Sequence, residues 1–453
     1  MISLKEALEL SPEEIIEFRK QLKEKIKEKK EIGAYVEQLI DEDILDDFAG
    51  IPIALKDNIQ VKGHSITSAS KILQGYVAPY NATVVEKMLS KGLAPFGRTN
   101  MDEFAMGNTT ENSFYGKTLN PTDYSRVPGG SSGGSAAAVG AGLAIAALGS
   151  DTGGSIRQPA AFCGCVGFKP SYGRVSRYGL GAYSSSLDQI GPITQNVEDA
   201  AILYDIIAGN DEKDSTSADI DFKPTAPNLD ANKKFKIAFI KNYIDGAKDE
   251  IKKAFYELKD KLIAMGHEVI EKELESSKYA IASYYIIATA EASTNLSRYD
   301  GVRYGRRAKA QTLREMYEKT RGEGFGEEVQ RRMLLGTFVL SSGYYDAYYI
   351  KAQKARAYIK KSYEEIYKDA DLILMPVSPD VAPKFGAFKD PLESYLSDIY
   401  TVGANLTGFP ALSLPIAKNS EGLNISAQFI AKAYDEQSVL DVSFGLEKYL
   451  KGN

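Results

Sequence analysis

The segment from Val127 to Gly154 constrains the fold of this chain most strongly; it reads VPGGSSGGSAAAVGAGLAIAALGSDTGG. Two turns rich in glycine and serine flank a run of small apolar residues from Ala136 to Leu148. Because small side chains allow close approach of neighbouring backbones, we expect this run to form one tightly packed helix. Turns that present serine are typical of nucleophilic chemistry or of anion binding by backbone N–H groups.

The overall composition is that of a globular protein and excludes several classes of function. The 453 residues are 43% hydrophobic, and 61 acidic residues outnumber 55 basic ones. This balance argues against a nucleic-acid-binding surface on the chain, although a partner subunit could bind nucleic acid. The run Ala136 to Leu148 is too short to span a bilayer, and the acidic N-terminus does not resemble a targeting peptide. We therefore expect a cytoplasmic protein without membrane contact.

Cysteine and histidine are too scarce for metal or disulfide chemistry. The chain has two cysteines, Cys163 and Cys165, and two histidines, His64 and His267. Two cysteines cannot build a disulfide framework, and no spacing of these residues predicts a metal site.

The distribution of elements predicts an α/β fold around one large sheet. Residues 1–48 are expected to form an N-terminal helical region, with one helix starting at Ser11-Pro12 and a second from Ala34 to about Phe48. Residues 49–453 then form the catalytic domain, in which 211–234 is an exposed loop. Predicted elements of this domain are strands at 50–55, 236–239, 267–271, 370–376 and 409–416, and helices at 247–265, over most of 277–369 and at 435–451.

Four interpretations of the serine-bearing turns compete. A phosphate cradle is disfavoured because GGSSGGS lacks the lysine that ends a Walker A loop. A nucleophile elbow at Gly129–Gly133 needs a histidine downstream, and the one candidate, His267, opens a predicted strand. Close helix packing alone does not require serines at both ends of the run. A lysine base remains: Lys56 ends an apolar strand, where burial would lower its pKa and make its amine a competent base.

The motifs around these residues resemble the amidase signature family. They are KDN at 56–58, GGSSGGSAAAVGAG at 129–142 and GSDTGGSIRQPAAFCG at 149–164. The resemblance covers about residues 48–450 and implies that family's fold, a large mixed twisted sheet covered by helices on both faces. It also implies a Ser-cisSer-Lys triad, with Ser155 as nucleophile, Ser131 as bridging serine on a cis peptide bond and Lys56 as base.

The same resemblance assigns an oxyanion hole to the backbone amides of Thr152, Gly153 and Gly154, since a glycine-rich turn can aim several N–H groups at one point. For Asp151 and Arg157 we expect a bracing role at this turn. A different motif, Ile66-Thr67-Ser68-Ala69-Ser70, departs from the family, which often has a cysteine there, and Cys165 replaces a branched apolar residue. The N-terminal helical region is also shorter than in the family.

Further segments resemble one branch of the family, the glutaminase subunits of tRNA-dependent amidotransferases. They are 172–194, 291–305, 324–356 and the region around Asp398. In that branch glutamine is hydrolysed through a glutamyl-enzyme ester. The resemblance implies that Arg332 and Asp398 pair with the α-carboxylate and α-ammonium of glutamine, and that Tyr284 is a further contact. One cation and one anion suit a zwitterion, although either residue alone is also explained by a surface salt bridge.

The branch also implies partners and cofactors. Two other subunits would join this chain, one small and one larger that binds tRNA and ATP. The larger one would use ATP and Mg to amidate Glu-tRNA(Gln), Asp-tRNA(Asn) or both. No cofactor or metal is expected on this chain, and tRNA would be reached only through the complex. The alternatives are a stand-alone amidase for small amides and a catalytically silent scaffold, which would need a broken triad.

Overall fold

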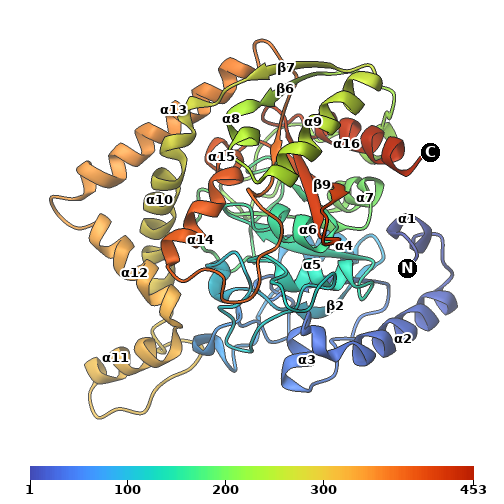
Figure 1. The fold of residues 1–453 in the computed structure, drawn as a ribbon. Coiled ribbons are helices and arrows are strands. Elements are labelled where there is room, and N and C mark those ends of the chain that lie inside the picture. The colour runs from blue at the N-terminus through green and yellow to red at the C-terminus, as the bar shows by residue number, and fades with distance from the viewer. Residues whose placement is uncertain (453) are drawn as a thin grey trace.

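A single mixed sheet of ten strands organises the structure, a computed structural model that describes residues 1–452 (Figure 1). Across the sheet the strand order is β2-β1-β3-β5-β4-β9-β10-β8-β6-β7. In chain order the strands are β1 (Ile51–Lys56), β2 (Leu93–Thr99), β3 (Ala146–Asp151), β4 (Val166–Lys169), β5 (Gln189–Thr194), β6 (Lys236–Ile240), β7 (Glu268–Lys272), β8 (Leu372–Pro376), β9 (Ala411–Lys418) and β10 (Asn424–Ile430).

Strand direction divides the sheet into a centre and two flanks. β1 runs parallel to β2 and β3 at one edge, and β6 runs parallel to β7 and β8 at the other. The pairs between β3 and β8 are antiparallel. The predicted large mixed sheet is confirmed.

Helices cover both faces of the sheet. They are α1 (Leu4–Ala7), α2 (Pro12–Glu28), α3 (Val36–Ile40), α4 (Thr83–Leu89), α5 (Gly133–Gly140), α6 (Arg157–Cys163), α7 (Val197–Ile207), α8 (Lys241–Asp245), α9 (Asp249–Ala264), α10 (Ala280–Asn295), α11 (Leu313–Gly324), α12 (Glu327–Val339), α13 (Lys351–Ile366), α14 (Pro391–Ser397), α15 (Val402–Thr407) and α16 (Glu436–Lys451). Among residues 1–452, none of the helices combines the length and apolar character needed to cross a membrane.

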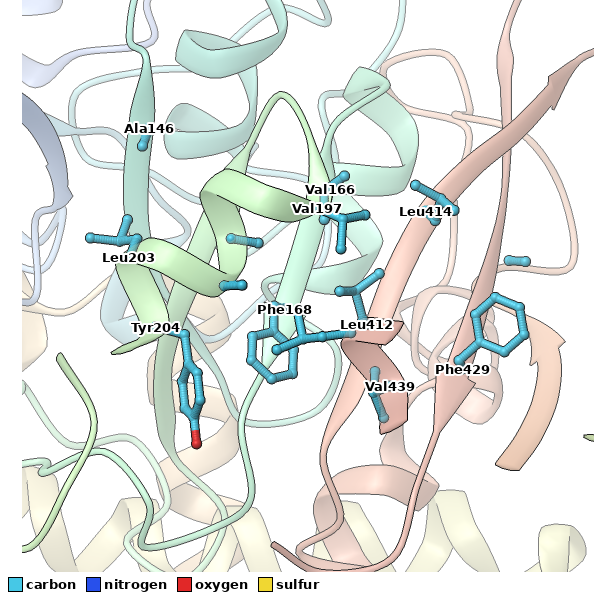
Figure 2. Close-up of a cluster of buried hydrophobic side chains, with 14 of the residues drawn as sticks. Ala146, Val166, Phe168, Val197, Leu203, Tyr204, Leu412, Leu414, Phe429 and Val439 are labelled. Atoms are coloured by element: carbon cyan, nitrogen blue, oxygen red, sulfur yellow. The ribbon is translucent and has the colours of Figure 1, made fainter. Parts of the chain in front are cut away.

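The main core lies between the sheet and helices α4, α7, α9 and α16. Figure 2 shows its centre, where Phe168 of β4 and Leu412 of β9 meet Tyr204 of α7 and Val439 of α16. On the opposite face, α5 and α6 bury one cluster and α10, α13 and α15 another. Since side chains alternate along a strand, Leu55 of β1 enters the main core while Ala54 and Lys56 face α5.

The run of small residues forms a helix and a strand, so the prediction of one helix from Ala136 to Leu148 is wrong. Helix α5 ends at Gly140, and β3 begins at Ala146. Gly142 has a φ of 67° in the turn between them, a conformation that favours glycine. The close packing is real: a Cβ on Gly140 would lie 2.6 Å from the carbonyl oxygen of Cys163. Small size permitted packing in both forms, and strand pairing decided the second half.

The N-terminal region also differs from the prediction in part. Ser11 caps α2 together with Glu14, as its sequence indicates. The second helix, expected over 34–48, is only Val36–Ile40, because Asp41 ends it in a left-handed conformation with a φ of 59°. Acidic residues follow, and a negative charge is unfavourable at a helix C-terminus.

The other predicted elements lie close to their expected bounds. β1, β6, β7, β8, β9, α9 and α16 match predicted elements, and α10 to α13 occupy most of 277–369. Residues 211–234 contain one short 3-10 turn at Ala226–Asn228. Strands β2, β4, β5 and β10 were not predicted.

Candidate active site

Lys56 lies at the end of β1 and is completely buried. Its Nζ lies 2.7 Å from Ser131 Oγ, 2.9 Å from Ser132 Oγ and 2.9 Å from Ser150 Oγ. Asn58 Nδ2 donates to the same Ser150 hydroxyl at 3.0 Å. The amine is therefore surrounded by hydroxyl groups, and its hydrogen bonds within residues 1–452 include no carboxylate.

Burial lowers the pKa of Lys56 to about 7, since a charged amine is poorly solvated there. The carboxylates of Asp102, Asp151 and Asp188 act in the opposite direction from a distance. A substantial fraction of the amine is therefore neutral near neutral pH and able to accept a proton.

Ser131 follows a cis peptide bond, Gly130–Ser131, as the resemblance predicts. The turn is held from two sides: the Gly130 N–H donates to Gln158 Oε1 at 2.9 Å, and the Ser131 carbonyl accepts from the Asp102 N–H at 3.2 Å. A Cβ on residue 130 would lie 2.2 Å from Asp102 Oδ2, so this position requires glycine.

The turn after β3 carries Ser155 and is braced from beneath. Asp151 accepts from Arg157 Nε at 3.1 Å, and both side chains are fully buried. The guanidinium holds the pKa of Asp151 well below its usual range, although burial acts against it. Arg157 also donates to Asn405 Oδ1 at 2.7 Å and to Gln428 Oε1 at 2.8 Å. The predicted bracing role of this pair is confirmed.

Ser155 faces a small cavity beside this turn. Gly130, Gly153, Gly154 and Gln158 line the cavity with it. The Ser155 carbonyl accepts from the Ser132 N–H at 3.1 Å, which joins the two serine-bearing turns through their backbones. Ser155 Oγ makes no hydrogen bond to a side chain within residues 1–452 and is open to the cavity.

The predicted oxyanion donors differ from one another in the structure. The Gly154 N–H donates to Asp151 Oδ1 at 2.8 Å and is already occupied, so its assignment as a donor is not supported. The N–H groups of Thr152 and Gly153 have no acceptor within residues 1–452. Gly154 is still needed for shape: its φ is 124°, and a Cβ there would lie 2.3 Å from Thr401 Oγ1.

The predicted substrate contacts Tyr284, Arg332 and Asp398 line the same cavity as Ser155. Arg332, only 4% exposed, donates through Nε to Glu328 Oε1 at 2.7 Å and through Nη1 to the Tyr183 hydroxyl at 2.8 Å. Its Nη2 has no hydrogen-bond partner within residues 1–452, which leaves a donor for an anion.

Asp398 is the anionic counterpart of Arg332. Its Oδ1 accepts from Asn108 Nδ2 at 2.8 Å and its Oδ2 from the Tyr285 hydroxyl at 2.7 Å. Burial raises the pKa of Asp398 to about 6, and these two donors act against the shift. Tyr284 packs edge-on against Tyr285 and closes over Gly153, where a Cβ would lie 2.5 Å from the Tyr284 hydroxyl.

Neither histidine belongs to this site. His64 lies 3.6 Å from Asp47, and His267 accepts from the Phe235 N–H at 3.2 Å beside β7. Within residues 1–452 there is no cluster of histidine, cysteine and acidic residues that could hold a metal ion.

Comparison with known proteins identifies the family. The family described as Amidase matches residues 17–440. The chain belongs to the amidase family. The A subunit of glutamyl-tRNA(Gln) amidotransferase from Campylobacter fetus subsp. fetus (strain 82-40) is 71% identical over 453 residues, all of both chains.

Solved amidase-family structures share the fold. The crystal structure of the A subunit of glutamyl-tRNA(Gln) amidotransferase from Thermotoga maritima has a TM-score of 0.82 and 41% identity, covering 99% of this chain and 94% of that one. A 6-aminohexanoate cyclic dimer hydrolase complexed with substrate has a TM-score of 0.80 and 26% identity, covering 98% of this chain and 94% of that one. The amidase signature fold is therefore confirmed.

Several residues of this amidase-family site were not predicted. They are Asp102, Asn108, Gln158, Tyr183 and Glu328, which hold the catalytic turns or the substrate contacts. Only Gln158 lies within a quoted motif, and its residue type carries no catalytic signal. The others are common polar residues whose partners are distant in the sequence.

Proposed function

We propose that this chain is the glutaminase component of a tRNA-dependent amidotransferase, which hydrolyses glutamine and supplies the ammonia to a partner protein. The observation that carries the proposal is the buried Lys56 amine, 2.7 Å from Ser131 Oγ and without a carboxylate partner. The high identity to A subunits of glutamyl-tRNA(Gln) amidotransferase supports the choice of reaction.

In the first step, Ser155 Oγ attacks the carbon of the glutamine side-chain amide. Its proton passes to Ser131 Oγ, while the Ser131 proton passes to the neutral Lys56 amine. The C–N bond of the resulting tetrahedral intermediate then breaks, and the departing nitrogen takes a proton back through Ser131 to leave as ammonia. A glutamyl ester on Ser155 remains. Water, deprotonated by the same relay, cleaves this ester to glutamate and restores the Ser155 hydroxyl.

Backbone donors stabilise the negative oxygen of each tetrahedral intermediate. We assign this role to the N–H groups of Thr152 and Gly153, because that of Gly154 is bonded to Asp151. Thr152 is held by its own hydroxyl, which donates to Asp188 Oδ1 at 2.6 Å.

Recognition of glutamine uses the two charges at the other end of the cavity. Arg332 binds the α-carboxylate through its unbonded Nη2, and Asp398 binds the α-ammonium. Glu328 neutralises part of the charge of Arg332 when the site is empty, so a neutral zwitterion enters without leaving an uncompensated charge. Tyr284 packs over the aliphatic part.

The partners follow from the names of the relatives, each of which is one component of a larger amidotransferase. We propose two partner subunits in the cytoplasm, one small and one larger that binds tRNA and uses ATP and Mg. The acidic balance of this chain is consistent with tRNA being bound by the partner.

The experiment replaces Ser155 with alanine in the complex isolated by a tag on this chain. We expect loss of glutamine hydrolysis by several orders of magnitude. The control Ser362→Ala should retain it, because Ser362 lies on α13 outside the cavity lining and donates only to the Tyr358 carbonyl of its own helix. Activity of Ser155→Ala within tenfold of wild type would contradict the nucleophile assignment. Isolation of a lone chain that cleaves small amides would favour the stand-alone amidase.

A further inference from the structure

Asn108 lies between the catalytic turn and Asp398 and is only 7% exposed. Its Nδ2 is 2.8 Å from Asp398 Oδ1, 3.1 Å from Ser397 Oγ and 3.0 Å from the Ser394 carbonyl oxygen. Its Oδ1 accepts from Ser394 Oγ at 2.7 Å. Every polar atom of this side chain is therefore bonded to the segment that carries Asp398.

The backbone of Asn108 is fixed to the reaction centre. Gln158 Nε2 donates to the Asn108 carbonyl at 3.0 Å, and Gln158 Oε1 accepts from the N–H of Gly130, the residue before Ser131. One glutamine thus sets the position of Asn108 relative to the bridging serine, and Asn108 in turn sets the position of Asp398.

We infer that Asn108 is a positioning residue that makes the site selective for amides with an α-ammonium group, because it aims the Asp398 carboxylate at that group. This inference rests on the proposed glutaminase function. Each carboxylate oxygen of Asp398 receives one donor from the protein, Asn108 on Oδ1 and Tyr285 on Oδ2. Since a carboxylate oxygen can accept two hydrogen bonds, each keeps a lone pair for the ligand.

The same hydrogen bond keeps Asp398 ionised. Burial raises the pKa of Asp398, with Asp151 acting in the same direction, while Asn108, Tyr285 and Arg332 lower it. The Tyr284 hydroxyl, also near this carboxylate, is neutral, since burial raises its pKa well above its usual range. Removing the Asn108 donor therefore raises the pKa of Asp398 further. As pH falls, the protonated carboxyl would then lose the ammonium group at a higher pH than in wild type.

The test compares Asn108→Ala and Asn108→Asp with wild type in the isolated complex, using two ligands. Glutamine carries the α-ammonium, and glutaramate is the same amide without it. For Asn108→Ala we expect about 10- to 100-fold lower kcat/KM for glutamine, mainly through KM, as for loss of a hydrogen bond to a charged group. The affinity for glutaramate, measured as substrate or as competitive inhibitor, should change by less than about twofold. The acid limb of kcat/KM for glutamine should move to higher pH.

Asn108→Asp keeps the shape but replaces the donor by a second carboxylate, so its loss with glutamine should be larger than that of Asn108→Ala. Asp390→Ala is the matched control, because Asp390 caps the N-terminus of α14 without touching Asp398. It should leave the ratio of the two ligands unchanged.

Equal losses for both ligands in Asn108→Ala, or an unmoved acid limb, would overturn the inference and leave Asn108 a structural residue. A wild-type complex without glutaminase activity would instead refute the proposed function. These two failures are distinct, since the first requires an active wild type.

Discussion

Two lysines at the ends of strands show what separates a base from a buried charge. Lys56 ends β1 and Lys169 ends β4; they are 0% and 2% exposed, and burial lowers the pKa of each to about 7. The Lys56 amine meets three hydroxyl groups. The one hydrogen bond of the Lys169 amine within residues 1–452 goes to the Pro170 carbonyl, at 2.8 Å.

The difference lies in what the neighbours can do with a proton. A hydroxyl can donate to a neutral amine and so pass it a proton, whereas a carbonyl oxygen can only accept. Arg157 also lowers the pKa of Lys169, while Asp151 and Glu436 act against this. A lowered pKa alone therefore does not identify the catalytic lysine; the surrounding donors do.

The largest expected effect comes from removing the two amines in turn. Lys56→Met should lower kcat for glutamine hydrolysis by about 10⁴-fold or more, as when one member of a triad is lost. Lys169→Met should stay within about tenfold of wild type, measured in the same assay on complexes whose folding is checked by circular dichroism. A comparable loss in both variants would remove the distinction between the two lysines.

The pH dependence should report Lys56 alone. Because the base acts in its neutral form, kcat/KM should fall as pH drops below about 7, the pKa that burial gives Lys56. The Lys169→Met variant should show the same acid limb. A limb that shifts or disappears in that variant would mean that Lys169 contributes to the titration.

A smaller effect is expected from the hydroxyls that surround Lys56 without relaying its proton. Ser132→Ala removes one acceptor of the Lys56 amine but leaves Ser131 in place. We expect roughly a tenfold loss of kcat, the size of one hydrogen bond to a charged group. A loss as large as that of Ser131→Ala would move the bridging role to Ser132.

The smallest effect concerns stability. An amine with a pKa lowered to about 7 in the folded state and near 10.4 in the unfolded state binds fewer protons when folded, so stability rises with pH between these values. Lys169→Met should remove this contribution and flatten the rise of Tm from pH 7 to pH 9. Circular dichroism melts over that range check it, and an unchanged slope would mean that Lys169 is solvated in the folded protein.

Local sequence was sufficient for much of the fold. The cap at Ser11, the apolar strand before Lys56 and the periodic helices after residue 277 follow from short-range chemistry. It failed where a segment had no pattern of its own. The run from Ala136 to Leu148 is small and apolar throughout, so only pairing of β3 with β1 and β5 decides that its second half is a strand.

For the site, the motifs by themselves determined which residue types were available: a lysine at a strand end, serines in glycine-rich turns and too few histidines for another base. Only the tertiary structure decided which hydroxyls surround Lys56 and that the Gly154 N–H is occupied. The same holds for Asn108 beside Asp398, which lie 290 positions apart in the chain. The physical reason is that hydrogen-bond partners are set by distance and angle in space, and neither follows from residue type or spacing when the partners lie on different elements.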